Sequence, residues 1–232
     1  MRTGLATVTK SSATDLVTAH DRAAEQLIVD GLRAERPDDA IVGEEGTSVG
    51  GTSGHEWFID PIDGTTNFVY GLAAWSTSVA VARDAEMIAG AVYVPVTDEL
   101  FAARAGHGAT LNGEPIRCSE RDELALALVA TGFAYAPGAR VVQAERVARL
   151  IGSIRDVRRL GSAAIDLCHV ASGRVDAYYE EHLNAWDAAA GELIAREAGA
   201  VTSDFAGGRA DPSNLVAAGP RLHSQFLGLL AG

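Results

Sequence analysis

Residues 57–68 read WFIDPIDGTTNF, an apolar run that ends in two acids, a proline, a glycine and two threonines. The first three residues are aromatic or β-branched, as is typical of a buried strand, so Asp60 is expected at the carboxyl end of that strand. Pro61 fixes its own φ and favours an extended Asp60, which lets Asp63 follow without a ladder amide between the two acids. We therefore expect both carboxylates to point into one small space.

Two acids that lie this close repel each other at neutral pH unless one is protonated or a cation lies between them. Carboxylates are hard oxygen ligands of the kind that Mg²⁺ prefers, and the carbonyl of Ile62 is available as a further ligand. The Gly-Thr-Thr run at 64–66 is typical of a helix start, where unpaired N–H groups favour phosphate. Metal beside phosphate predicts phosphoryl chemistry. The alternative is a simple turn in which Asp60 or Asp63 caps the backbone.

The composition predicts a globular protein of mixed α/β or α+β class. At 232 residues, 47% hydrophobic and 22% charged, the chain can bury one large core or two modest ones. Nineteen Lys and Arg against 31 Asp and Glu give a net charge of −12, which argues against direct binding to nucleic acid or to an anionic membrane. No apolar run approaches the length of a membrane span, so a cytoplasmic protein is expected. Cys118 and Cys168 have no CxxC partner and are expected to be inert thiols.

A helix is predicted to begin near Thr18 and to end before Pro37. Thr18 and Asp21 have the spacing of a capping box, so Asp21 is either a capping acid or part of a site. The face expected to be buried carries Ala24, Leu27, Ile28, Gly31 and Leu32.

A second pair of acids follows the next predicted strand. Residues 40–43 read AIVG, a short apolar strand, and Glu44 and Glu45 come directly after it. Further antiparallel strands are predicted over residues 75–82, 87–94 and 99–104, with an Asn-Gly hairpin turn at 112–113. A charged segment after residue 118 marks the expected boundary between two subdomains.

The second half of the chain alternates predicted strands and helices. The strands cover residues 126–131, 177–180, 200–205 and 214–218, and the longer helices cover 140–151, 187–198 and 220–230. The first of these helices is expected to bury Val141, Ala144, Val147, Ala148 and Ile151. Ser162 and Asp187 each have the type and place of a helix cap, which is the alternative to a role in a site. His182 has no His or Cys neighbour at zinc-ligand spacing and is expected to be a loop residue.

Two blocks of the sequence resemble signatures of the inositol monophosphatase family, the Mg²⁺-dependent, lithium-sensitive sugar and inositol phosphatases. They are DPIDGTTNF at 60–68 and WDAAAG at 186–191. Shorter elements match as well, namely DLVTAHD at 15–21, GEE at 43–45 and GSAA at 161–164. The resemblance implies an α+β fold, an αβαβα layered sandwich of two subdomains. These would be residues 1–118 and 119–232, with the acids converging between them.

The resemblance also implies a role for each site residue. The implied metal ligands, for two or three Mg²⁺ ions, are Glu44, Asp60, the Ile62 carbonyl, Asp63 and Asp187. Glu44 is the implied partner of the water that attacks phosphorus, and Thr65 orients that water with Asp21 behind it. The implied phosphate- and substrate-binding residues are Asp63, Gly64, Thr65, Gly161, Ser162, Ala163, Glu180 and Asp187.

The implied function is the Mg²⁺-dependent hydrolysis of a small phosphate monoester. The run TTNF after DPIDG is closer to the inositol monophosphatase branch than to the nucleotide 3′-phosphatase branch, which tends towards TKEF. Myo-inositol monophosphate is therefore the substrate expected first, and histidinol phosphate and fructose 1,6-bisphosphate are the alternatives. In a different class of function, some bacterial relatives act as binding partners of transcription complexes. Because the family is usually dimeric, a homodimer is expected.

The start of the sequence departs from the family pattern. Family members usually carry another helical segment ahead of this point, whereas only nine residues precede Lys10 here. This implies either the loss of a helix or a different true start.

Overall fold

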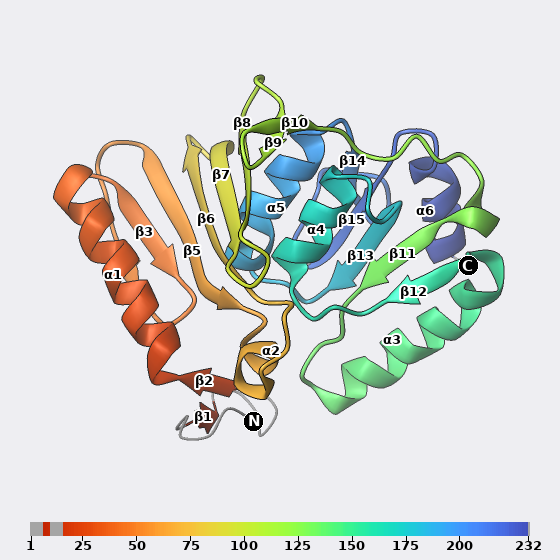
Figure 1. Cartoon of the computed structure of the whole chain (residues 1–232), viewed down its shortest axis with the longest axis horizontal. Coiled ribbons are helices and arrows are strands. Elements are labelled where there is room, and N and C mark those ends of the chain that lie inside the picture. Colours follow the sequence, from red (N-terminus) through yellow and green to blue (C-terminus); the bar gives the residue numbers. More distant parts are fainter. Residues whose placement is uncertain (1–6, 10–15, 232) are drawn as a thin grey trace.

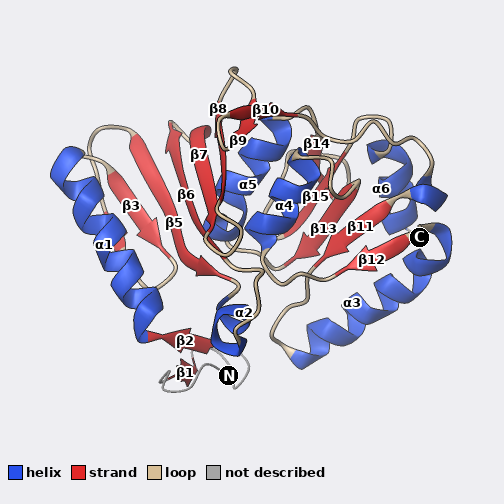
Figure 2. Cartoon of the chain, viewed as in Figure 1, coloured by secondary structure: helices blue, strands red, loops and turns tan. Residues whose placement is uncertain are grey.

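Helices and sheets alternate in layers in the computed structural model, which describes residues 7–9 and 16–231 (Figure 1). In order, the layers are helix α1, an eight-stranded sheet, helices α4 and α5, a five-stranded sheet, and helices α3 and α6 (Figure 2). The helices are Ala19–Glu35 (α1), Pro137–Leu150 (α3), Ala163–Ala171 (α4), Ala185–Glu197 (α5) and His223–Ala231 (α6). The predicted α+β layered sandwich is confirmed. Most of the short N-terminal segment lies outside the described residues.

The eight-stranded sheet is built from the first half of the chain. Its strands are β3 (Ala40–Gly43), β4 (Ser48–Val49), β5 (His55–Asp63), β6 (Ser76–Arg83), β7 (Glu86–Val94), β8 (Glu99–Arg104), β9 (Ala109–Leu111) and β10 (Glu114–Ile116). They lie in the order β10-β9-β8-β7-β6-β5-β3-β4, and only the β3–β5 pair is parallel. Asn112 and Gly113 have φ of 51° and 86°, which confirms the predicted hairpin turn.

Strand β5 continues past Asp60, where the sequence analysis predicted its end. It pairs with β6 from His55 to Asp60, and the pairing resumes at Asp63 opposite Ser76 after an irregularity. Pro61 lies in the interrupted stretch, because it has no N–H to give to the ladder. The sheet therefore holds both acids, one on either side of a local break.

The five-stranded sheet comes from the second half. Its strands are β11 (Leu128–Thr131), β12 (Asp156–Arg158), β13 (Ala177–Glu181), β14 (Val201–Asp204) and β15 (Asn214–Ala218), in the order β12-β11-β13-β15-β14. The remaining elements are β1 (Thr7–Thr9), paired with β2 (Leu16–Thr18), the short helix α2 (Thr65–Tyr70), and two 3₁₀ turns, η1 (Leu124–Leu126) and η2 (Ile151–Ser153). Within the described ranges, no helix combines the length and the apolar character needed to cross a bilayer.

Helices α4 and α5 form a central layer that both sheets bury. Two glycines set how closely this layer packs. A Cβ on Gly90 of β7 would lie 2.9 Å from the Cα of Ala190, and a Cβ on Gly191 would lie 2.8 Å from the Cβ of Leu167. Since α4 and α5 follow residue 119 yet share a core with the first sheet, the two halves of the chain are packed as one body. The division at residues 118 and 119 stays a prediction.

The inward face of α1 is partly acidic, which the apolar pattern did not predict. Its buried residues are Asp21, Glu25 and Val29, spaced four apart, while Leu27 is 75% exposed. The predicted face was therefore wrong at Leu27 and at Gly31, which is also exposed, although Ile28 and Leu32 pack beside the buried row. Carboxylates take inward positions here because hydrogen-bond donors from other segments meet them.

The buried stripe predicted for α3 was also wrong. Val141 is 61% exposed and Ile151, beyond the helix end, is 44% exposed, whereas Gln143 and Leu150 are buried. The Gln143 side chain accepts the Ala134 N–H at 2.9 Å, which turns this polar residue inward. The orientation of the helix thus follows the burial of Leu150 and one hydrogen bond to the segment just before the helix.

Replacing Leu150 by alanine should lower the free energy of unfolding by about 2–5 kcal/mol, because a fully buried side chain leaves a cavity. Val141→Ala on the same helix is the matched control, and it should change the free energy by no more than about 0.5 kcal/mol. Urea unfolding followed by circular dichroism measures both. Equal losses for the two variants would contradict this orientation of α3.

Candidate active site

The site residues predicted from separate motifs line one pocket of about 640 Å³. They come from the ends of β3, β5 and β13 and from the starts of α2, α4 and α5. Those that line it are Glu44, Asp60, Ile62, Asp63, Gly64, Thr65, Gly161, Ser162, Ala163, Glu180 and Asp187. Of the predicted residues only Asp21 is not in this lining, and it lies directly behind Thr65.

Asp21 is fully buried and serves two groups at once. Its Oδ2 accepts the backbone N–H of Thr18 at 2.8 Å, which completes the predicted capping box of α1. Its Oδ1 accepts the Thr65 hydroxyl at 3.1 Å, and the Ile62 carbonyl lies at the same distance from that hydroxyl. Thr65 has a single proton for these two acceptors. The alternatives of capping acid and site neighbour are therefore both realised in the geometry.

The acids of β5 are buried against one another and against other carboxylates. Burial raises the pKa of Asp60 well above its usual value, and the charges of Glu44 and Asp63 raise it further. Burial raises the pKa of Asp63 to about 7, although two donors oppose the shift. These donors are the Ser162 hydroxyl at 2.6 Å and the Ala164 N–H at 2.8 Å, both to Oδ2. The repulsion expected from the sequence is present.

Ser162 combines the two roles that the sequence left open. It is the N-cap of α4, because its Oγ accepts the Ile165 N–H at 3.2 Å, and it also donates to Asp63. This hydroxyl therefore links the start of α4 to the acid of the first sheet.

The sequence suggested Asp187 as the N-cap of α5, but this acid lies in the first turn of the helix. Asn184 is the cap, and its backbone N–H donates to Asp187 Oδ2 at 2.7 Å. Burial raises the pKa of Asp187 to about 7, while this N–H lowers it and the Asp63 charge raises it. The acid thus stabilises the helix start while its side chain lines the pocket.

Gly64 is required twice over where α2 begins. Its φ of 89° lies in the left-handed region. A Cβ there would also lie 2.9 Å from the Ala74 carbonyl oxygen and 3.0 Å from that of Gly161. Asn67, which the sequence analysis did not single out, donates to the Ala74 and Leu160 carbonyls at 2.5 and 2.8 Å. The start of α2 is therefore fixed against the segment that leads into α4.

Glu180, at the end of β13, adds another acid to the pocket lining. Burial raises its pKa to about 7, against the lowering effect of the Tyr178 hydroxyl, which donates to it at 2.8 Å. A Cβ on Gly132 would lie 2.0 Å from either carboxylate oxygen of Glu180. Tyr178 and Gly132 were missed from the sequence, because neither carries a motif of its own. His182 lines the pocket rim from a loop, as expected of its position after β13.

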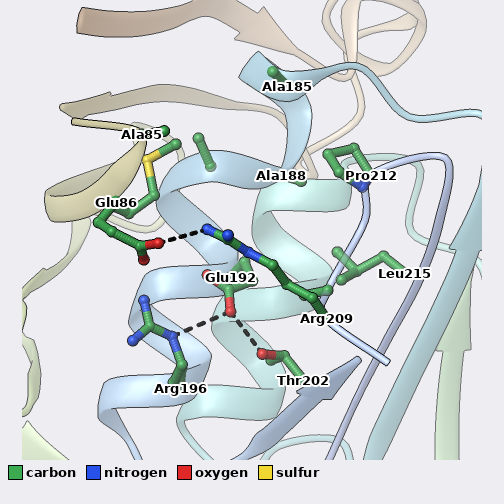
Figure 3. Close-up of a pocket in the computed structure, with 13 residues that line it drawn as sticks. Ala85, Glu86, Ala185, Ala188, Glu192, Arg196, Thr202, Arg209, Pro212 and Leu215 are labelled. Carbon is green, nitrogen blue, oxygen red and sulfur yellow. Dashed lines mark hydrogen bonds and ion pairs between the residues drawn. The ribbon is translucent and has the colours of Figure 1, made fainter. Parts of the chain in front are cut away.

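A second hollow of about 370 Å³ lies on another side of α5 (Figure 3). Its charged side chains are joined to one another: Arg209 to Glu86 at 2.8 Å and Arg196 to Glu192 at 3.2 Å. Glu192 also accepts the Thr202 hydroxyl at 2.6 Å. These interactions connect β7, α5, β14 and the segment before β15, so the polar groups of the hollow serve to hold these elements together.

The acid pocket offers the ligand chemistry of a hard divalent cation. Its lining includes carboxylate, carbonyl and hydroxyl oxygens, which suit Mg²⁺, together with the guanidinium of Arg159. A cation would relieve the carboxylate repulsion that adds to the effect of burial on the pKa of Asp60. Among the residues that the structure describes, no three Asp, Glu, His or Cys side chains already stand as a complete ligand group.

Known proteins match this chain over most of its length. Residues 1–231 match the model of the inositol monophosphatase family. An inositol-1-monophosphatase from Mycobacterium leprae is 47% identical over 200 residues, which make up 82% of this chain and 69% of that protein. The Nus factor SuhB of Pasteurella multocida is 43% identical over 223 residues, 94% of this chain and 84% of that protein. The crystal structure of the extragenic suppressor protein SuhB from Bartonella henselae has a TM-score of 0.93 at 35% identity, covering 98% of this chain and 88% of that one.

The fold, the acid pocket and these matches define the chain as a phosphoric monoester hydrolase. It belongs to the inositol monophosphatase family. The family resemblance seen in the sequence motifs is confirmed.

In the presence of a chelator, the protein should lose stability as the pH rises from 5.5 to 8. Asp63, Asp187 and Glu180 have pKa values of about 7 when folded, above those of the unfolded chain. The folded state therefore binds more protons between roughly pH 4 and 7, and each group contributes on the order of 1 kcal/mol or more to this dependence. Urea midpoints at the two pH values measure it. Asp187→Asn should reduce the difference, and a higher midpoint at pH 8 than at pH 5.5 would contradict the assignment.

Proposed function

We propose that this hydrolase cleaves small phosphate monoesters of polyols in a Mg²⁺-dependent reaction, with myo-inositol monophosphate as the first candidate. The observation that carries the proposal is the convergence of four acids from three separate motifs on one pocket, namely Glu44, Asp60, Asp63 and Asp187. A dense set of acids cannot attract a phosphate by itself, so the proposal requires a divalent cation between the acids and the substrate.

The metal ligands in this proposal are Glu44, Asp60, the Ile62 carbonyl, Asp63 and Asp187, and two or three Mg²⁺ ions are expected. Bound Mg²⁺ supplies charge neutralisation of the phosphate and lowers the pKa of a coordinated water. Glu44 then accepts a proton from the attacking water.

The remaining groups of the first half orient the reactants. Thr65 can hold the water through its hydroxyl oxygen while donating its own proton to Asp21, which lies 3.1 Å away. The Gly64 and Thr65 amides are the proposed contacts to the phosphate oxygens. In-line attack of water on phosphorus releases the alcohol with no covalent enzyme intermediate.

The substrate proposal is supported by groups that the second half of the chain contributes to the pocket. Glu180 is a half-buried acid that accepts the Tyr178 hydroxyl, and its carboxylate suits the hydroxyl groups of a polyol. Gly161, Ser162 and Ala163 line the pocket beside it and are the proposed further contacts to the substrate. The Mycobacterium leprae relative is named for inositol 1-phosphate hydrolysis. Histidinol phosphate and fructose 1,6-bisphosphate remain the alternative substrates.

A second function in transcription is the competing proposal of a different class. It is motivated by the Pasteurella multocida relative, which is named a Nus factor. A protein with a net charge of −12 could dock on a basic protein surface. The complete set of acids in the pocket favours catalysis, because a binding-only protein would not need them. A homodimer and a cytoplasmic location stay predictions.

Asp187→Asn should lower turnover by several orders of magnitude, because it removes one of the proposed ligand charges while preserving the size of the side chain. Glu192→Gln, on the same helix but in the second hollow, is the matched control and should keep near-normal turnover. Phosphate release at saturating Mg²⁺ and circular dichroism spectra are the measurements. Near-normal turnover in a folded Asp187→Asn protein would remove this acid from the site.

The wild-type protein should release phosphate from myo-inositol 1-phosphate faster than from histidinol phosphate, fructose 1,6-bisphosphate or 3′-phosphoadenosine 5′-phosphate. Release should require Mg²⁺ and be inhibited by millimolar lithium, as the family relationship implies. Initial rates over this panel, with and without chelator, decide the substrate class. A folded protein that releases phosphate from none of them would favour the binding role.

A further inference from the structure

The segment after β3 folds around a carboxylate that belongs to another element. Glu25 of α1 is 4% exposed. Its Oε2 accepts the Glu45 N–H at 2.8 Å, and its Oε1 accepts the Thr47 N–H at 3.2 Å and the Thr47 hydroxyl at 2.6 Å. Three donors from one short segment thus converge on one buried acid. We refer to residues 43–47 as the Glu44 loop.

The Glu44 loop is closed on itself and tied to β5. The Gly43 N–H donates to the Thr47 carbonyl at 2.8 Å, and the Glu44 N–H donates to the Ile59 carbonyl at 3.1 Å. The backbone of Glu44 is therefore held by β5 through its own N–H and by Glu25 through the N–H of the next residue. Neither bond uses the Glu44 side chain, which lines the pocket.

Gly43 makes the approach of Glu25 possible. A Cβ at this position would lie 2.4 Å from Glu25 Oε2 and 2.6 Å from its carboxyl carbon. Atoms cannot come this close without displacing the carboxylate, so any other residue at 43 would push Glu25 out of the loop. Glu25 and Gly43 are fitted to each other across two elements.

One face of α1 contacts both groups that we assign to the attacking water, Thr65 directly and Glu44 through its loop. Asp21 and Glu25 are one turn apart on the buried face of α1, since residues four apart share a face. Asp21 accepts the Thr65 hydroxyl, and Glu25 holds the loop that carries Glu44. Thr65 and the loop that carries Glu44, the two groups assigned to the attacking water, are thus both hydrogen-bonded to acids one helical turn apart.

We propose that Glu25 is a positioning residue that fixes Glu44 relative to Thr65 and thereby sets the affinity of the site for Mg²⁺. This inference rests on the proposed function, because Glu44 and Thr65 act together only in that reaction. Groups that hold a metal ligand in place commonly change metal affinity when they are removed. Glu25 acts through the loop and not on the substrate.

Glu25→Gln tests the proposal with little change of shape. The amide group it introduces would face backbone N–H donors, so at least one of the three hydrogen bonds is lost. We expect the Mg²⁺ dissociation constant, measured by isothermal titration calorimetry, to rise about tenfold, with a comparable fall in kcat/KM at low Mg²⁺. High Mg²⁺ should restore much of the rate.

Asp39→Asn is the matched control for a purely structural effect. Asp39 is a buried carboxylate just before β3, at the end of that strand away from Glu44, and it accepts the Ser53 hydroxyl at 2.6 Å and the Trp57 indole N–H at 2.9 Å. Its replacement should destabilise the protein to a similar degree but change the Mg²⁺ dissociation constant by less than about twofold.

Gly43→Ala provides a second route to the same contact if Glu25→Gln does not fold. This variant keeps the Glu25 side chain but displaces its carboxylate, so it should also weaken Mg²⁺ binding. In the double variant, the loss of Mg²⁺ affinity should be smaller than the sum of the two single losses. Unchanged Mg²⁺ affinity in either folded variant, or an equal loss in Asp39→Asn, would overturn the inference. A wild-type protein that binds Mg²⁺ but releases no phosphate would instead refute the proposed function, and the titration would still decide the role of Glu25.

Discussion

Carboxylates buried around one pocket repel one another, and much of the structure is arranged to hold them there. Burial raises the pKa of Asp60, Asp63 and Asp187, and the charges of neighbouring acids raise each further. Backbone and hydroxyl donors offset part of this cost, as the Ser162 hydroxyl does for Asp63. Either protonation of the acids or a bound divalent cation would therefore reduce the repulsion among the carboxylates of the pocket. This constraint explains why a protein built for anions is lined with acids.

The layered fold makes this arrangement possible because its central helices touch both sheets. Asp63 comes from the first sheet, while Ser162 and Asp187 come from the starts of α4 and α5. Close contacts fix the register between the layers, including that of Gly90 with Ala190 and that of Gly64 with the Gly161 carbonyl. Small residues at these contacts place side chains that are about 100 positions apart in sequence within 2.6 Å of each other, as Ser162 and Asp63 are.

The sequence predicted what depends on local pattern, and it failed where a distant partner decides. The strand that ends just before Glu44, and the capping spacing of Asp21, could be read from neighbouring residues. The inward turn of Gln143 could not, because its partner is found only after folding, and a count of apolar residues cannot register a buried amide. The same limit hid Glu25, whose donors lie on a loop twenty residues further along.

Asp21 and Asp187 hold the same position in their helices, the third residue of the first turn, and each accepts the N–H of its cap residue. Each also reaches the pocket, directly or through Thr65. Fraying of a terminal turn usually has no effect on function, because most terminal turns hold no residue of a binding site. Here, each opening of either first turn swings an acid away from its partner. The integrity of the pocket is thus coupled to the first turns of two helices, so an opening that leaves the rest of the fold intact would be enough to disassemble it.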